Sequence, residues 1–162
     1  MVVMINRTHK FPVIMLYVLS HMVITNFVFA KDYIPGSETS FTLVKPITIP
    51  ARSSSIYIQK NVVTRDESRI DFYYANCLFE QATLAKNDQI IKPDKFNVSE
   101  TRLSRIPETQ NLFEYQTLFY LTSEKTNKKY TLECQHWGEW SDWYLTREQI
   151  QDTIKVYFKI NP

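Results

Sequence analysis

The sequence predicts a mainly β domain, an antiparallel small barrel or sandwich with one short C-terminal helix and one disulfide. Three observations support this fold class. Several segments alternate apolar and polar residues, which is the period of a half-buried strand. The chain contains only two cysteines, and a single segment near its C-terminus has the start signal of a helix. We expect six to eight strands.

The alternation of apolar and polar residues, and the prolines and polar segments between the alternating runs, place the strands. The segments with the clearest period of two are SIYIQ (55–59), IDFYYANCLFEQ (70–81), LFEYQTLFYL (112–121) and YTLEC (130–134). They are rich in the aromatic and β-branched residues that strands favour. Pro46 and Pro50 bracket a further short strand, ITI, and polar connections follow at 64–69 and 84–89.

The polar stretch 123–129 predicts a hairpin loop, and this loop fixes a register. Antiparallel partners around it have residue numbers that sum to about 251. The pairs are Leu121 with Tyr130, Phe119 with Leu132, and Thr117 with Cys134. All six residues belong to the apolar faces of their strands, so the register is self-consistent.

One segment breaks the alternation. Thr146 followed by Gln149 has the spacing of a capping box, and Ile150 begins an apolar pair four residues apart. These signals predict a short helix over Arg147–Ile154. The alternating segment 156–160 predicts a last strand that closes the sheet.

The first thirty residues differ from the rest. A basic start, an apolar middle and a small-residue exit at Ala30 are typical of a secretory signal peptide. A retained membrane anchor is the alternative, because residues 11–30 are long enough to cross a bilayer, but polar residues interrupt the run. We therefore expect a signal peptide over 1–30 and a single β-rich domain over 31–162, periplasmic or secreted, with no stable membrane span after processing.

Processing also changes the charge of the protein. The whole chain has 19 basic and 17 acidic residues, and removal of Arg7 and Lys10 leaves 17 of each over 31–162. A neutral domain has no net field that would attract nucleic acid. We therefore expect no nucleic-acid partner.

Both cysteines of the chain lie in the predicted mature domain. An isolated pair in an exported protein predicts one disulfide, here between Cys77 and Cys134. Two separate buried thiols are the alternative. Closing a loop of 57 residues would stabilise the fold by roughly 4 kcal/mol in the chain-entropy model.

No pattern in the sequence predicts catalysis, a metal site or a cofactor. His136 is the only histidine of residues 31–162, so a small secreted hydrolase would have to use it, yet its neighbours carry no catalytic signature. We interpret it as an edge or loop histidine. Asp66, Glu67 and Asp71 lack the spacing of a calcium loop and are better explained as a solvated turn with nearby arginines. With two glycines in the chain, a phosphate-binding loop is excluded.

The three tryptophans, Trp137, Trp140 and Trp143, lie at intervals of three. Gly138 argues against a helix there, so we expect an irregular loop. Its indoles could form a platform for a glycan or peptide. They could equally fold back as a lid over the end of the core, and the lid is favoured because aromatics mainly serve packing in a domain of this size.

A resemblance adds to this interpretation. The run FTLVKPITIPARSSSIYIQ, followed by YYANCLFE, LECQHW and LTREQIQDTI with a final apolar strand, resembles a family of small exported proteobacterial proteins with two cysteines and no assigned function. The resemblance covers most of residues 39–160, without the tryptophan-rich stretch. It implies a periplasmic location and supplies no catalytic residues.

The function expected from these observations is that of an exported, non-catalytic β-domain of the cell envelope with a binding or structural role. Its partner would be an envelope protein or a glycan. A binding module that uses the three tryptophans and a hydrolase that uses His136 are the alternatives.

Overall fold

A computed structural model describes residues 39–84 and 86–162. The predicted signal peptide lies outside the described residues. The helical elements are α1 (Arg147–Ile154) and a 3-10 turn, η1 (Glu67–Arg69). The strands are β1 (Ser40–Leu43), β2 (Ile47–Ile49), β3 (Ser55–Gln59), β4 (Val62–Thr64), β5 (Asn76–Gln81), β6 (Gln89–Ile91), β7 (Asp94–Pro107), β8 (Phe113–Ser123), β9 (Lys129–Gly138) and β10 (Phe158–Asn161).

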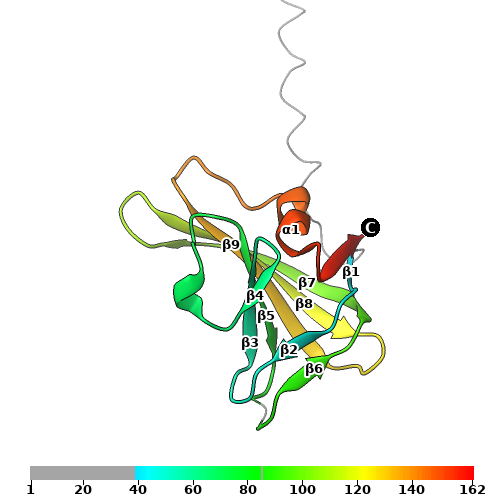
Figure 1. Cartoon of the computed structure of the whole chain (residues 1–162). Helices are drawn as coiled ribbons and strands as arrows, with labels where there is room; N and C mark the ends of the chain where they lie inside the picture. The colour runs from blue at the N-terminus through cyan, green and yellow to red at the C-terminus, as the bar shows by residue number, and fades with distance from the viewer. Residues whose placement is uncertain (1–38, 85) are drawn as a thin grey trace, which may run out of the picture. The chain divides into compact units, whose positions relative to one another are not determined.

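Eight of these strands form one antiparallel sheet, in the order β10-β1-β7-β8-β9-β5-β3-β4. The sheet curls into a half-barrel, and β2 pairs with β6 in a separate two-stranded ladder (Figure 1). The mainly β prediction is therefore confirmed. The choice between barrel and sandwich is decided in favour of one curled sheet with two edges that do not pair with each other.

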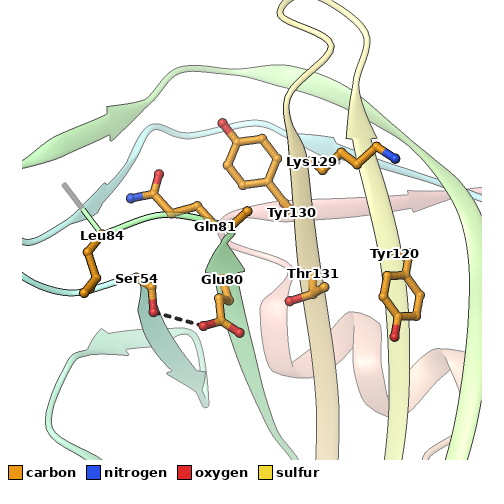
Figure 2. Close-up of a pocket in the computed structure, with 9 residues that line it drawn as sticks. Ser54, Glu80, Gln81, Leu84, Tyr120, Lys129, Tyr130 and Thr131 are labelled. Carbon is orange, nitrogen blue, oxygen red and sulfur yellow. Dashed lines mark hydrogen bonds between the residues drawn. The ribbon is translucent and has the colours of Figure 1, made fainter.

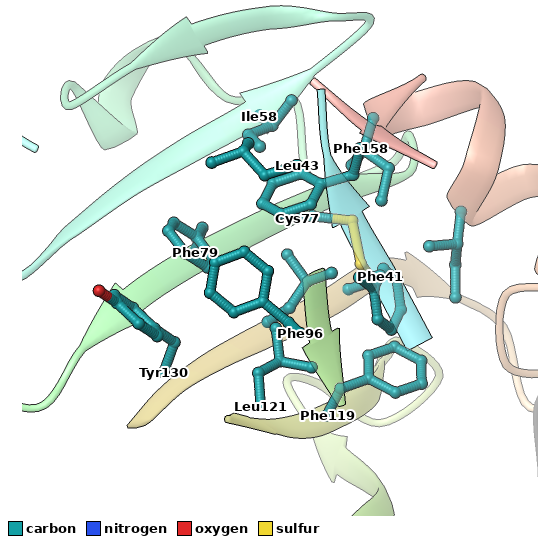
Figure 3. Close-up of a cluster of buried hydrophobic side chains, with 14 of the residues drawn as sticks. Phe41, Leu43, Ile58, Cys77, Phe79, Phe96, Phe119, Leu121, Tyr130 and Phe158 are labelled. Atoms are coloured by element: carbon teal, nitrogen blue, oxygen red, sulfur yellow. A yellow bond between two sulfur atoms is a disulfide. The ribbon is translucent and has the colours of Figure 1, made fainter. Parts of the chain in front are cut away.

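Aromatic rings fill the concave face of the sheet. Phe41, Phe79, Phe96, Phe119 and Phe158 come from five different strands and are fully buried. Their rings pack at tilted or edge-on angles, with centroids 5.0 Å apart for Phe41 and Phe119 and 5.3 Å apart for Phe79 and Phe158 (Figure 3). Each fully buried phenylalanine contributes roughly 1.5–3 kcal/mol through the hydrophobic effect.

The predicted disulfide joins Cys77 of β5 to Cys134 of β9. The two residues face each other directly across the ladder, with Cα atoms 4.0 Å apart (Figure 3). The predicted hairpin register is also confirmed, since Leu121 pairs with Tyr130 and Thr117 with Cys134.

Helix α1 lies between the two edges of the curled sheet and contacts β3, β5 and β10 (Figure 1). It begins where predicted, with the Thr146–Gln149 capping box in place. The side-chain amide of Gln151 donates to the carbonyl oxygen of Phe158 (2.8 Å) and accepts from the backbone N–H of Ile160 (2.7 Å). This side chain therefore replaces a neighbouring strand along the β10 edge.

Two expectations about strands need correction, and one strand was missed. The strand predicted over 70–81 begins only at Asn76, because the backbone N–H of Tyr74 bonds to the carbonyl oxygen of Asp71 and turns the chain first. The last strand starts at Phe158 and not at 156. The longest strand, β7, was not identified from the sequence, because a bulge between Val98 and Glu100 interrupts its alternation.

Candidate functional site

The three tryptophans do not share one environment. Trp137 lies within β9, where its ring stacks on Phe72 with centroids 5.1 Å apart. Trp140 and Trp143 lie in the connection from β9 to α1 and are 66% and 72% exposed. The expected irregular loop therefore begins only after Gly138. The expectation that the indoles are buried as a lid is wrong for Trp140 and Trp143.

The connection does cover the end of the core, but with other side chains. Leu145 is buried, and the ring of Tyr144 packs edge-on against Tyr115, 5.6 Å away. The hydroxyl group of Tyr115 donates to the carbonyl oxygen of Glu139 at 2.7 Å. These contacts fix the connection at both ends, so the two intervening indoles are held outward on a defined backbone.

A tight turn supports Trp140 directly. A carboxylate oxygen of Asp142 accepts from the backbone N–H of Glu139 (2.7 Å), and the N–H of Asp142 donates to the carbonyl oxygen of Glu139 (3.0 Å). A Cβ atom at Gly138 would lie 2.9 Å from the Cβ atom of Asp142, closer than such atoms approach in proteins. Gly138 is therefore required by the close return of the chain.

Arg105 of β7 packs against Trp140, and sequence reasoning missed it. Its guanidinium group lies 4.0 Å from the centroid of the Trp140 ring and 5.1 Å from that of Phe113. Phe113 in turn meets Trp140 edge-on, with centroids 5.3 Å apart. We refer to these three residues, together with the exposed Trp143 on the same β9–α1 connection, as the indole surface. It could have been found only by extending the β7–β8 register, which pairs Arg105 with Tyr115.

The indole surface lies at one end of the sheet. The β7–β8 hairpin turn and the orange connection from β9 to α1 project together at that end in Figure 1. Arg105 belongs to no ion pair within residues 39–84 and 86–162. Its N–H groups therefore remain available to an anionic or hydroxyl-bearing ligand, while the exposed indoles offer apolar area.

His136 lies in β9 and not in a loop, and it pairs with Tyr115 of β8 just beyond the last β5–β9 pair. Its ring stacks on Tyr115 with centroids 5.5 Å apart. Burial lowers the pKa of His136, and the Asp142 carboxylate opposes that shift. Its Nδ1 atom is buried without a hydrogen-bond partner among the described residues. A general base is normally oriented by such a bond, so this geometry does not favour a hydrolase.

Two carboxylates share one amide on the convex face of the sheet. The side-chain nitrogen of Gln116 donates to Glu114 and to Glu133, at 3.1 Å in each case. Burial raises the pKa of Glu114, although the Gln116 bond opposes the shift. Burial also raises the pKa of Glu133, and the carboxylates of Glu114 and Glu80 add to it. Burial therefore disfavours the ionised form of both Glu114 and Glu133.

The acidic segment near η1 forms a turn beside an arginine, as predicted for Asp66, Glu67 and Asp71. Asp66 accepts from the backbone N–H of Ser68 at 3.1 Å and forms a 3.6 Å ion pair with Arg69. Across residues 39–84 and 86–162, no group of three or more His, Cys, Asp or Glu side chains is placed to hold a metal ion.

A separate open depression of about 390 Å³ lies at the opposite end of β5 and β9 from the indole surface (Figure 2). Glu80 lines it and accepts from the hydroxyl group of Ser54 at 2.9 Å. None of the predicted site residues borders this depression. Its shape is shallow, and its polar groups are partly paired with one another.

Comparison with known proteins gives no relative. No protein-family model, curated protein or solved structure matches this chain. The geometry of the indole surface must therefore carry the functional argument. In the part of the chain that the structure describes, no helix has the length and apolar character needed to cross a membrane.

Proposed function

We propose that this chain is an exported, non-catalytic β-domain of the cell envelope that binds a partner through the indole surface. The observation that carries the proposal is the exposure of Trp140 and Trp143, 66% and 72%. Exposed large apolar side chains are unfavourable in water, and their clustering marks interaction sites. Here a hydrogen-bonded turn holds them outward, so the exposure is built into the fold.

The chemistry of the surface suits a glycan or a peptide. An indole ring presents large rigid area at a low entropy cost, and it stacks on sugar rings as well as on apolar side chains. Arg105, packed against Trp140, adds hydrogen-bond donors beside that area. A purely structural role would not require these groups to face solvent.

Export is proposed on two grounds. The Cys77–Cys134 disulfide is typical of an oxidising compartment, and the first thirty residues have the composition of a signal peptide. The resemblance to small exported proteobacterial proteins agrees with a periplasmic location.

A binding experiment tests the proposed surface. The double variant Trp140→Ala/Trp143→Ala and the wild type would be used to capture ligands from envelope extract and to probe glycan and peptide arrays. We expect the double variant to lose binding while unfolding at the same denaturant concentration. Ile90→Ala is the matched control, because Ile90 is also an exposed apolar residue (64%) but lies in β6. Equal binding by wild type and double variant would refute the proposal.

Export has its own test. The full chain would be expressed in a Gram-negative host, and the periplasmic fraction would be sequenced from its N-terminus. We expect the mature protein to begin at Lys31. A product that retains Met1 in the cytoplasmic fraction would contradict export without affecting the binding result.

A further inference from the structure

The long strand β7 is paired on both sides over only part of its length. Strand β1 covers it from Asp94 to Asn97, and the carbonyl oxygen of Thr39 accepts from the N–H of Val98 at 3.3 Å. From Thr101 to Pro107, β7 pairs with β8 alone within the described residues. Among the described residues, a seven-residue edge therefore lies beyond the start of β1 at Ser40.

The register shows which backbone groups face outward on this edge. The N–H of Glu108 donates to the carbonyl oxygen of Leu112 at 2.9 Å, in the same register as the β7–β8 pairs. Backbone bonds in an antiparallel pair alternate along the strand, so the even-numbered residues of this part of β7 bond to β8. The N–H groups of Thr101, Leu103 and Arg105 consequently point away from β8.

Side chains of α1 bond to the backbone of β10 at the edge of the sheet. Gln151 bonds to the backbone of Phe158 and Ile160, and Arg147 donates to the carbonyl oxygen of Ile160 at 3.3 Å. At the opposite edge of the sheet, β4 is only three residues long. Natural proteins cap or shorten exposed edges because these pair readily with other strands. Within residues 39–84 and 86–162, neither a capping side chain nor a short strand length protects the edge at 101–107.

The side chains along this edge define the chemistry of a partner. Residues 101–107 include two arginines and no acid. Arg102 is paired with Glu100 at 2.6 Å, whereas Arg105 lies against Trp140 with no ion pair among the described residues. Leu103 and Ile106 are 38% and 40% exposed and lie on opposite faces of the strand. A strand added here would meet apolar area on both faces and a free guanidinium group on one.

We propose that the β7 edge from Thr101 to Pro107 docks an extended, acidic segment of a partner polypeptide, which adds to the sheet beside the indole surface. Backbone bonds to Leu103 and Arg105 would supply affinity, and a carboxylate at Arg105 would supply selectivity. This inference rests on the proposed function, because it names the partner of the same surface. Pairing of this edge with the same edge of a second copy is the alternative, and it would protect the edge amides in the free protein.

The test uses the mature protein and two synthetic peptides. In one, valine alternates with glutamate; in the other, lysine replaces glutamate. Titration calorimetry and tryptophan fluorescence should show the glutamate peptide binding at least about tenfold more tightly, since one charge-assisted hydrogen bond accounts for such a difference. Equal affinity for the two peptides, or no binding of either, would overturn the inference.

Leu103→Pro removes an outward N–H while leaving the bonds to β8 intact, and proline is tolerated on edge strands. It should weaken binding of the glutamate peptide about tenfold. Leu103→Ala is the matched control, because it removes most of the same side chain but keeps the N–H, and its affinity should be higher than that of the proline variant. Equal loss in both variants would exclude backbone pairing.

Arg105→Glu provides a second variant that leaves the backbone unchanged. It should reverse the preference, so that the lysine peptide binds more tightly than the glutamate peptide. An unchanged preference would exclude Arg105 as the selective group. This variant keeps the inference testable if the proline variant fails to fold.

Hydrogen exchange distinguishes a free edge from an occupied one. The amides of Leu103 and Arg105 should exchange rapidly in the free protein and slowly with the glutamate peptide, whereas the amide of Val98 should be protected in both. Protection of Leu103 and Arg105 in the free protein would mean that the chain itself or a second copy covers the edge, and would overturn the inference. If the tryptophan double variant loses a glycan ligand while no peptide binds, the proposed function survives and this inference fails.

Discussion

The side-chain oxygen of Asn61 accepts a hydrogen bond from the backbone N–H of Val156, 3.0 Å away across 95 positions of the chain. The side-chain nitrogen of Asn61 donates to the carbonyl oxygen of Asp152 (3.0 Å), and its backbone N–H donates to that of Thr153 (3.1 Å). One residue in the β3–β4 turn therefore satisfies the C-terminal end of α1, whose last carbonyl groups have no partner within the helix. Asn61 thus links one edge of the half-barrel to the helix that lies between its two edges.

Replacing Asn61 should loosen the attachment of α1. Asn61 has a φ of 64°, which glycine adopts without strain, so Asn61→Gly removes the two side-chain bonds and keeps the turn. We expect a loss of about 1–3 kcal/mol in the free energy of unfolding, from two hydrogen bonds, measured in urea. Asn61→Asp retains the acceptor for Val156 but sets a carboxylate oxygen against the carbonyl oxygen of Asp152 at the negative end of α1, so it should lose at least as much. If both variants unfold like the wild type, the link contributes nothing.

Removing the disulfide should destabilise the domain without changing its fold. The pair Cys77→Ala/Cys134→Ala is expected to lower the free energy of unfolding by up to about 4 kcal/mol, as the chain-entropy model gives for a loop of this length. Wild-type protein in a reducing agent should unfold at a denaturant concentration close to that of the double variant. A wild type that is insensitive to the reducing agent would show that the bond adds little.

Glu133 should make stability depend on pH in the acid range. Burial and the nearby carboxylates raise its pKa in the folded protein, so the folded state binds more protons than the unfolded state between the ordinary pKa of a glutamate and the raised one. Stability therefore falls as pH rises through that window. Glu133→Gln should raise stability at pH 7 by up to about 1 kcal/mol and have little effect near pH 3.

The control for this prediction is Glu148→Gln. Glu148 lies in the first turn of α1 and is exposed, where a negative charge is favourable, so its loss should give no gain at pH 7. A gain of equal size in both variants would indicate a general charge effect and contradict the role assigned to Glu133.

Gly138→Ala should disturb the turn that presents Trp140. The new Cβ atom would contact the Cβ atom of Asp142 at 2.9 Å, and Asp142 is fixed by its bonds to Glu139. We expect a loss of roughly 1–3 kcal/mol from overpacking and an altered tryptophan emission spectrum. In a variant that also carries Asp142→Gly, which removes that Cβ atom, the two substitutions should cost less than the sum of their separate effects. Strict additivity would mean that the two residues do not clash.

The sequence alone was sufficient wherever the deciding interactions were local. The capping box at Thr146 marks the first turn of α1, and the alternation around residues 123–129 fixes the register that pairs Phe119 with Leu132. The disulfide was also predictable, because the chain has two cysteines and each lies on the apolar face of its strand. Local periodicity, end signals and a small cysteine count are physical constraints that a single chain displays directly.

Other features depend on contacts between distant parts of the chain. Strand β7 was not predicted because the bulge after Val98 shifts its alternation, and only its pairing with β8 shows it to be one strand. Trp140 and Trp143 were expected inside, yet Tyr144 and Leu145 fill the space over Tyr115 first. A spacing of three residues does not say which side chains of a loop face the core.

The sequence by itself therefore determined the strand-rich class, the hairpin register, the helix and the disulfide of this protein. Tertiary structure alone decided that the sheet stays open as a half-barrel, that Asn61 and Gln151 attach α1 between its two edges, and that Arg105 lies against Trp140. The physical reason is the separation in sequence between the residues that interact. Periodicity and capping act within a few residues, whereas these contacts join residues far apart in the chain, and the curl of the whole sheet brings them together.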